Sequence, residues 1–172
     1  KAQSLTLSMP PLILAYGVAE NALRRFWQQV AVIQSRTAAE QVERFGSALL
    51  AYVAGRRRSY LLVLALLSLG AYLLFQHALA AGWLDPWLTT GHPGELLFIF
   101  GLSLLAYWLL GLGLFNCMFI VTLGRPQVAL RAVIWGILVM ATTGAMLSSI
   151  SYTSAVFAFV LAAFAFAIIS WE

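Results

Sequence analysis

Long apolar stretches, separated by short polar or basic segments, dominate the sequence. No Asp, Glu, Lys or Arg occurs in residues 59–84, 96–124 or 132–171. Each of these stretches exceeds the roughly 20 residues that cross a bilayer as a helix. Residues 61–75 and 157–169 are apolar on both faces, unlike the alternating strands of a membrane β-barrel. The pattern therefore predicts an all-α integral membrane protein.

The apolar stretches predict five transmembrane helices in a single membrane domain, residues 1–172. The predicted spans are residues 2–23, 59–81, 96–123, 128–147 and 155–171. The first contains Pro10 and Pro11, which should kink or break it because proline lacks the backbone donor and clashes with the preceding turn. An alternative interpretation of this stretch is a signal peptide with Lys1 as its basic region, although two prolines in the apolar part disfavour it.

The segment 24–58 differs from the rest because it is rich in arginine. Thr37 and Glu40 have the spacing of a capping box, which marks a helix start. The apolar residues that follow recur at steps of three and four, namely Val42, Phe45, Leu49 and Val53. Gly55 is placed to end that helix. We therefore expect the first helix to continue to Ile33, a turn at 35–37, and an amphipathic cytoplasmic helix over 38–54 at the membrane surface.

The basic residues predict the orientation of the spans. After Lys1, every Lys or Arg lies within 24–58 or 125–131. The positive-inside rule then puts 24–58 and 124–127 in the cytoplasm, and loops 82–94 and 148–154 outside. Arg56, Arg57, Arg58 and Arg125 are expected at the cytoplasmic interface, among the headgroups of membrane lipids. We expect a multi-pass membrane protein.

Composition narrows the possible functions. Charged residues make up 9% of the chain and hydrophobic residues 62%, which excludes an ordinary soluble domain with about 25% charged residues. The net charge of +4 is first an orientation signal in such a chain, so we do not expect nucleic acid as a partner. Cys117 is the only cysteine, which excludes an internal disulfide and a thiolate metal cluster.

Titratable residues near the outer boundary do not form a recognisable catalytic pattern. His77, Asp85, His92 and Glu95 could meet there, but their spacing matches no metal-binding motif. Polar residues are also ordinary at the ends of spans. We therefore expect no catalytic residue, no metal and no cofactor, and a protein that is not an enzyme.

Four polar residues are candidates for a substrate path or gate. Glu20 lies in an apolar span, where an acid is costly unless it has a partner. Arg24 is four residues further on, so an ion pair within the helix is the alternative. Asn116 can contact a ligand or form a hydrogen bond between helices, the more ordinary role. Arg131 can line a polar path or reach the headgroups with its side chain.

Several short runs, taken in order, resemble one transporter family. They are the proline-containing run 11–20, Arg-Arg-Phe-Trp at 24–27, the helix at 40–52, and 116–125 with Asn-Cys-Met-Phe at its start. Their order and spacing are similar to the C-terminal half of Pel-type exopolysaccharide exporters. These exporters belong to the multidrug/oligosaccharidyl-lipid/polysaccharide flippase superfamily.

The resemblance implies a helical transporter lobe that moves a polysaccharide or lipid-linked saccharide through a central cavity by alternating access. It also implies that the protein lies in the bacterial inner (plasma) membrane. It maps the acid-then-basic pattern onto Glu20, Arg24 and Arg25, and the turn onto Asn116 and Arg125. It also implies partners: other inner-membrane subunits, or the remainder of a transporter of which this chain would be most of one lobe. The alternative is a non-transport membrane subunit that scaffolds an inner-membrane complex.

Overall fold

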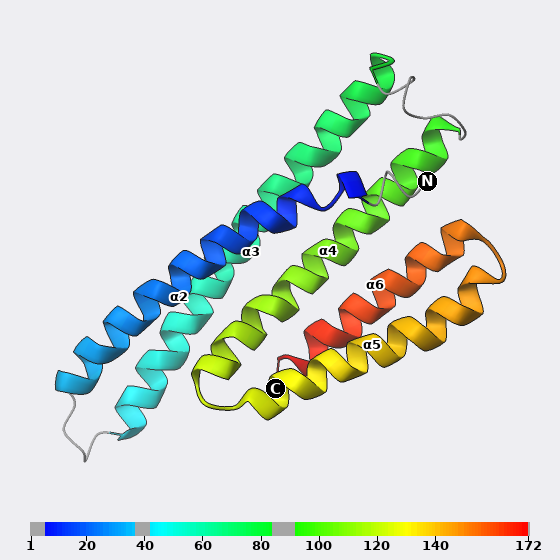
Figure 1. Cartoon of the computed structure of the whole chain (residues 1–172). Helices are drawn as coiled ribbons and strands as arrows, with labels where there is room; N and C mark the ends of the chain where they lie inside the picture. The colour runs from blue at the N-terminus through cyan, green and yellow to red at the C-terminus, as the bar shows by residue number, and fades with distance from the viewer. Residues whose placement is uncertain (1–5, 37–41, 84–91, 172) are drawn as a thin grey trace.

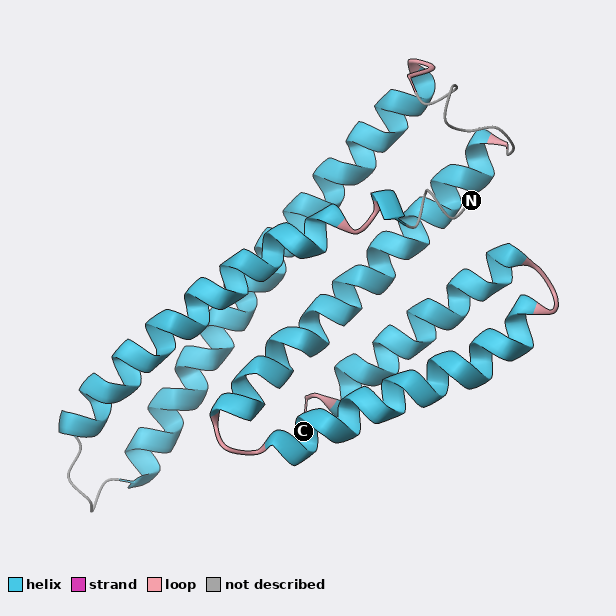
Figure 2. Cartoon of the chain, viewed as in Figure 1, coloured by secondary structure: helices cyan, strands magenta, loops and turns pink. Residues whose placement is uncertain are grey.

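A computed structural model describes residues 6–36, 42–83 and 92–171 (Figure 1). Regular secondary structure in these ranges is entirely helical (Figure 2). The main helices are α2 (Pro10–Arg36), α3 (Val42–Ala80), α4 (Pro93–Thr122), α5 (Pro126–Ser148) and α6 (Tyr152–Ile169). The predicted all-α class is thus confirmed.

Among the residues that the structure describes, three helices are long and apolar enough to cross a membrane: Gly46–Ala80, Pro93–Thr122 and Pro126–Ser148. The apolar part of α6, Thr153–Ile169, is shorter. The helix α2 carries Glu20, Arg24 and Arg25 along its length, which lowers its hydropathy. The structure therefore supports a membrane protein, and the number of five spans stays a prediction.

The helix boundaries follow local sequence rules. Proline occupies the first turn of both α4 and α5, where its missing donor costs nothing. Gly124 follows α4 with a φ of +78°, a backbone conformation that glycine adopts without strain. The side chain of Ser151 accepts a hydrogen bond from the backbone N–H of Ser154, at 3.0 Å, and so caps α6.

The chain breaks near the first two prolines, as expected. Residues 6–7 form a helical turn, the chain bends at residues 8–9, and α2 then begins at Pro10. From there α2 continues unbroken to Arg36, three residues beyond the predicted limit of Ile33. The predicted capping box at Thr37 and Glu40 lies outside the described residues.

The prediction of a separate amphipathic helix is wrong. Helix α3 runs without interruption through Gly55, so the basic segment and the second predicted span are one helix of 39 residues. Leu49 and Val53 pack against the core formed with α2, instead of facing a membrane surface. The first half of α3 packs against α2, which stabilises this part of the helix. The free-energy cost of a glycine within a helix is therefore too small for Gly55 to end it.

Aromatic contacts fix how α2, α3 and α4 pack together. The Tyr60 ring of α3 stacks on Phe115 of α4, with ring centroids 4.8 Å apart. The Phe26 ring of α2 meets Phe119 edge-on at 5.2 Å, close to the end of α4. The remainder of α2 and the first part of α3 therefore extend beyond the end of α4, as Figure 1 shows at its lower left.

The helix α4 is the central element of the molecule. Half of its most apolar window is buried (50%), whereas the corresponding windows of α3 and α5 are each 11% buried. It contacts α2 and α3 on one side and α6 on the other, while α5 packs mainly on α6 (Figure 1). The outer surfaces of α3 and α5 are left free for lipid or for other protein.

Candidate functional site

A pocket of about 440 Å³ lies between α3, α4, α5 and the end of α6, and we call it the basic pocket. It is lined by Leu50, Val53, Arg57, Asn116, Phe119, Ile120, Leu123, Arg125, Val128, Ser170 and Trp171. All of these elements end or begin at the same end of the molecule, the lower left of Figure 1. The pocket brings together three of the residues that the sequence analysis selected: Arg57, Asn116 and Arg125.

A buried polar pair forms part of the pocket wall. The side-chain amide of Asn116 donates a hydrogen bond to Ser170 Oγ at 3.4 Å. Ser170 Oγ in turn donates to the carbonyl of Ala167 at 2.9 Å. Asn116 is 7% exposed and Ser170 1% exposed, so this pair joins α4 to α6 inside the protein. The interhelical hydrogen bond expected as the ordinary role of Asn116 is present.

The cationic part of the pocket comes from two separate elements. The guanidinium of Arg57 lies over the Trp171 ring, 3.6 Å from its centroid, a cation–π contact between α3 and the end of α6. Arg125 lies in the turn between α4 and α5. Within the described ranges the ion pair seen is Arg24 with Glu20, and neither pocket arginine is paired with a carboxylate.

Glu20 and Arg24 do not face the pocket. Arg24 donates to Glu20 Oε1 at 2.7 Å across one helical turn, and the side chain of Arg24 is 77% exposed and that of Glu20 50%. They lie on the face of α2 opposite Ala19 and Ala22, which pack in the core. The ion-pair alternative is therefore what the structure contains, on the outer face of α2.

The other predicted basic residues are dispersed. Arg56 lies over the Tyr52 ring of its own helix, 5.2 Å from the centroid. Arg58 and Arg131 are exposed, and neither lines the basic pocket. Arg131 is consequently placed as a surface residue of α5.

At the opposite end of the molecule, His77 and Glu95 have different contacts. The His77 ring meets Trp83 edge-on at 5.8 Å, and Glu95 accepts a hydrogen bond from Thr153 at 3.2 Å. Asp85 lies outside the described residues. Among the residues that the structure describes, no group of three or more His, Cys, Asp or Glu side chains could hold a metal ion.

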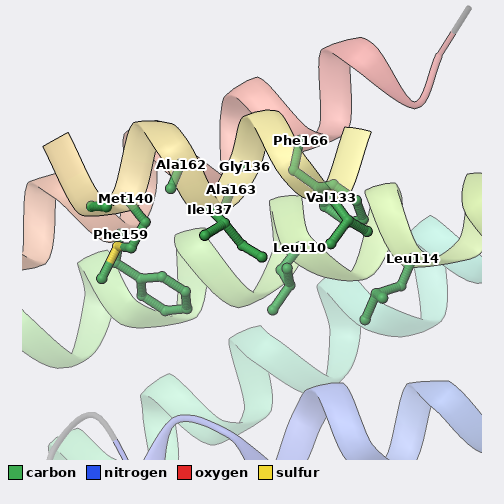
Figure 3. A pocket seen from close by; sticks show the side chains of 11 residues that line it. Leu110, Leu114, Val133, Gly136, Ile137, Met140, Phe159, Ala162, Ala163 and Phe166 are labelled. Atoms are coloured by element: carbon green, nitrogen blue, oxygen red, sulfur yellow. The ribbon is translucent and has the colours of Figure 1, made fainter. Parts of the chain in front are cut away.

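A second hollow, with a volume of about 430 Å³, lies between α4 and α5, and α6 forms its third side (Figure 3). Its walls are aliphatic or aromatic, including Leu110 and Leu114 of α4, Ile137 and Met140 of α5, and Phe166 of α6. With no polar side chain in its lining, it offers no means to recognise a polar ligand.

Two pocket residues, Ser170 and Trp171, were not selected from the sequence. They follow a continuous apolar run, and a Trp at the end of such a run is ordinary in membrane proteins. The signal that could have identified them is their position at the arginine-rich end of the predicted topology. Of the two, Trp171 is exposed, whereas Ser170 is buried.

The fold and this site define an all-helical protein with helices suited to a bilayer and a polar pocket at its basic end. Comparison with known proteins finds no matching family model, no matching curated protein and no matching solved structure.

Proposed function

We propose that the chain is a membrane module of an exporter or flippase that moves a polysaccharide or lipid-linked saccharide across the bacterial inner membrane. The resemblance to Pel-type exporters supports this function through the short runs at 24–27 and 116–125. The apolar helices support its placement in a membrane.

The basic pocket is the observation that carries the proposal. Arg57 and Arg125 offer planar, charged donors suited to phosphate or carboxylate groups. Trp171 offers an aromatic face, and Asn116 a polar wall. Polar groups between apolar helices destabilise a membrane protein unless they bond to a neighbouring helix or bind a solute. This pocket is open enough to hold a solute.

The exposed apolar faces indicate that the module works within a larger assembly. In the structure, α5 presents Leu130, Ile134 and Leu138 to the outside. Such a face is suited to lipid or to the helices of another lobe, and a transporter cavity needs a second wall. We propose that further helices, in the same protein or in other inner-membrane subunits, supply that wall.

The test is export by cells that carry substitutions in the intact protein. Asn116→Leu removes the polar wall at nearly constant volume, and we expect extracellular polysaccharide to fall several-fold while membrane insertion is unchanged. Thr142→Val is the matched control, because Thr142 bonds to its own helix on the exposed face of α5. Unchanged export in Asn116→Leu, with Trp171→Leu also active, would refute the proposal.

The second candidate is a scaffolding subunit without a transport role, favoured by the exposed apolar face of α5. It predicts that Ile134→Ser combined with Leu138→Ser releases a co-purifying membrane partner, whereas pocket substitutions have no effect. Co-purification in mild detergent, with export measured in parallel, separates the two functions.

A further inference from the structure

A groove continues from the basic pocket toward the middle of the molecule. It has a volume of about 420 Å³ and is lined by Leu109, Leu112, Phe164, Ala167, Ile168 and Trp171. We call it the apolar groove. Trp171 lines both the basic pocket and the apolar groove, so the two hollows meet at this side chain.

The residues of α4 show that the two hollows follow one helix face. Leu112 and Leu109 precede Asn116 by four and seven residues, and Ile120 follows it by four. These spacings place all four on the same side of an α-helix. The lining along this face changes from Leu109 and Leu112 in the apolar groove to Asn116 and Ile120 in the basic pocket, with Arg125 just beyond the helix end.

The same change occurs along α6. Phe164 and Ile168 contribute to the apolar groove, and Ser170 to the basic pocket, with Trp171 between the two hollows. The site is therefore amphipathic along its length, with charge at one end and about two helical turns of apolar wall leading away from it. This is the polarity of a lipid that lies parallel to the helices.

We infer that the basic pocket and the apolar groove together bind an anionic phospholipid, with its phosphate between Arg57 and Arg125 and an acyl chain along Leu109, Leu112 and Ile168. Arginine pairs well with phosphate, and basic pockets between transmembrane helices on the cytoplasmic side suit anionic headgroups. Trp171 sits where an amphipathic ring is favoured, between headgroup and hydrocarbon. This inference does not depend on the export proposal.

The choice of a phospholipid over a lipid-linked saccharide follows from the position and size of the site. The positive-inside rule places this end at the cytoplasmic leaflet, which is rich in anionic phospholipid. A pocket of about 440 Å³ suits a phosphate with its glycerol. The two ligands share phosphate and hydrocarbon, so binding experiments must distinguish them.

The experiment titrates phosphatidylglycerol into the purified full chain in neutral detergent and measures the bound fraction by native mass spectrometry. Each pocket arginine should contribute about fivefold in affinity, so Arg57→Gln combined with Arg125→Gln should weaken binding by about 25-fold. Arg58→Gln combined with Arg131→Gln is the matched control, because it removes the same charge from surface positions outside the pocket. The control should change affinity by less than twofold.

Further arms test the two halves of the ligand. Glycerol phosphate, which has no acyl chain, should bind at least tenfold more weakly than phosphatidylglycerol. Leu112→Gln should weaken lipid binding and leave the affinity for glycerol phosphate unchanged. Circular dichroism of each variant verifies folding, and Trp171→Leu provides a second pocket variant if the double arginine variant loses helicity.

Three results would overturn the inference. Equal losses in the pocket and surface variants would show that the lipid responds only to net charge. Equal affinity for glycerol phosphate and the lipid would show that the apolar groove does not contribute to binding. Tighter binding of polyprenyl phosphate than of phosphatidylglycerol would make the occupant a lipid-linked substrate. Export can be normal or lost in any of these cases, so the failures of the two proposals are distinguishable.

Discussion

Two glycines of α4 lie where its neighbours approach most closely. A Cβ atom at Gly113 would overlap the Phe166 ring of α6, which has little freedom to move. At Gly111 it would come within 2.8 Å of Leu64 and 2.9 Å of the Tyr60 hydroxyl on α3. Small residues at these positions thus permit close packing on both sides of α4, Gly111 against α3 and Gly113 against α6.

Gly113→Ala should destabilise the protein because the added methyl group forces α6 away from α4. We expect the free energy of unfolding to fall by about 1–3 kcal/mol. Gly144→Ala is the control, since nothing lies within 4 Å of its Cβ position. The control should be neutral or up to about 1 kcal/mol more stable, because alanine favours helix. Thermal unfolding in detergent, followed by circular dichroism, measures both, and equal stability would contradict the packing argument.

The Glu20–Arg24 pair should matter little for stability, because both side chains are at least half exposed. Glu20→Gln is expected to lower the free energy of unfolding by no more than about 0.5 kcal/mol. The same unfolding assay measures this value. A loss above about 2 kcal/mol would indicate that the pair is desolvated by a contact that the isolated chain does not contain.

At the scale of the helices, α3 should behave as one rigid element through Gly55. Spin labels at the exposed positions Leu50 and Leu66 are separated by sixteen residues of continuous helix, or about 24 Å. Pulsed electron paramagnetic resonance should give one narrow distance distribution there, as narrow as for labels at Leu62 and Leu74. A broad or shorter distribution for the first pair would place a hinge at Gly55.

The limits of some helices could be predicted from the sequence more closely than those of others. The limits of α4 and α5 were within three residues of the prediction because charge gaps and prolines mark them. The continuity of α3 was not predictable, since Gly55 ends a helix only where packing does not hold the chain. The apolar stripe that includes Leu49 and Val53 is as compatible with packing on a bilayer surface as with packing against α2.

The candidate site was predictable only in part. Asn116, Arg57 and Arg125 could be selected as polar residues in or beside apolar spans. Their convergence depends on the end of α6 returning beside α3, and no local pattern specifies this contact. For the same reason Glu20, Arg24 and Arg131 could not be recognised as surface residues without the tertiary arrangement.

At the scale of the whole molecule, the proposed orientation can be tested by labelling single cysteines in a Cys117→Ala background. Trp83→Cys and Ser149→Cys should react with an impermeant maleimide in intact spheroplasts. Ala54→Cys and Gln127→Cys should react only after the membrane is permeabilised, because they lie at the basic end. Labelling of all four positions from the same side would contradict a topology in which both turns cross the bilayer.

The unbroken course of α3 has a mechanical consequence. Arg57 and Ala80 are separated by 23 residues of the same helix, or about 35 Å, so this part of α3 acts as a lever arm. A tilt of about 5° at the basic pocket would displace the opposite end by about 3 Å. The proposed headgroup, on entering or leaving beside Arg57, would thereby be connected to the opposite end of α3 without any intermediate relay.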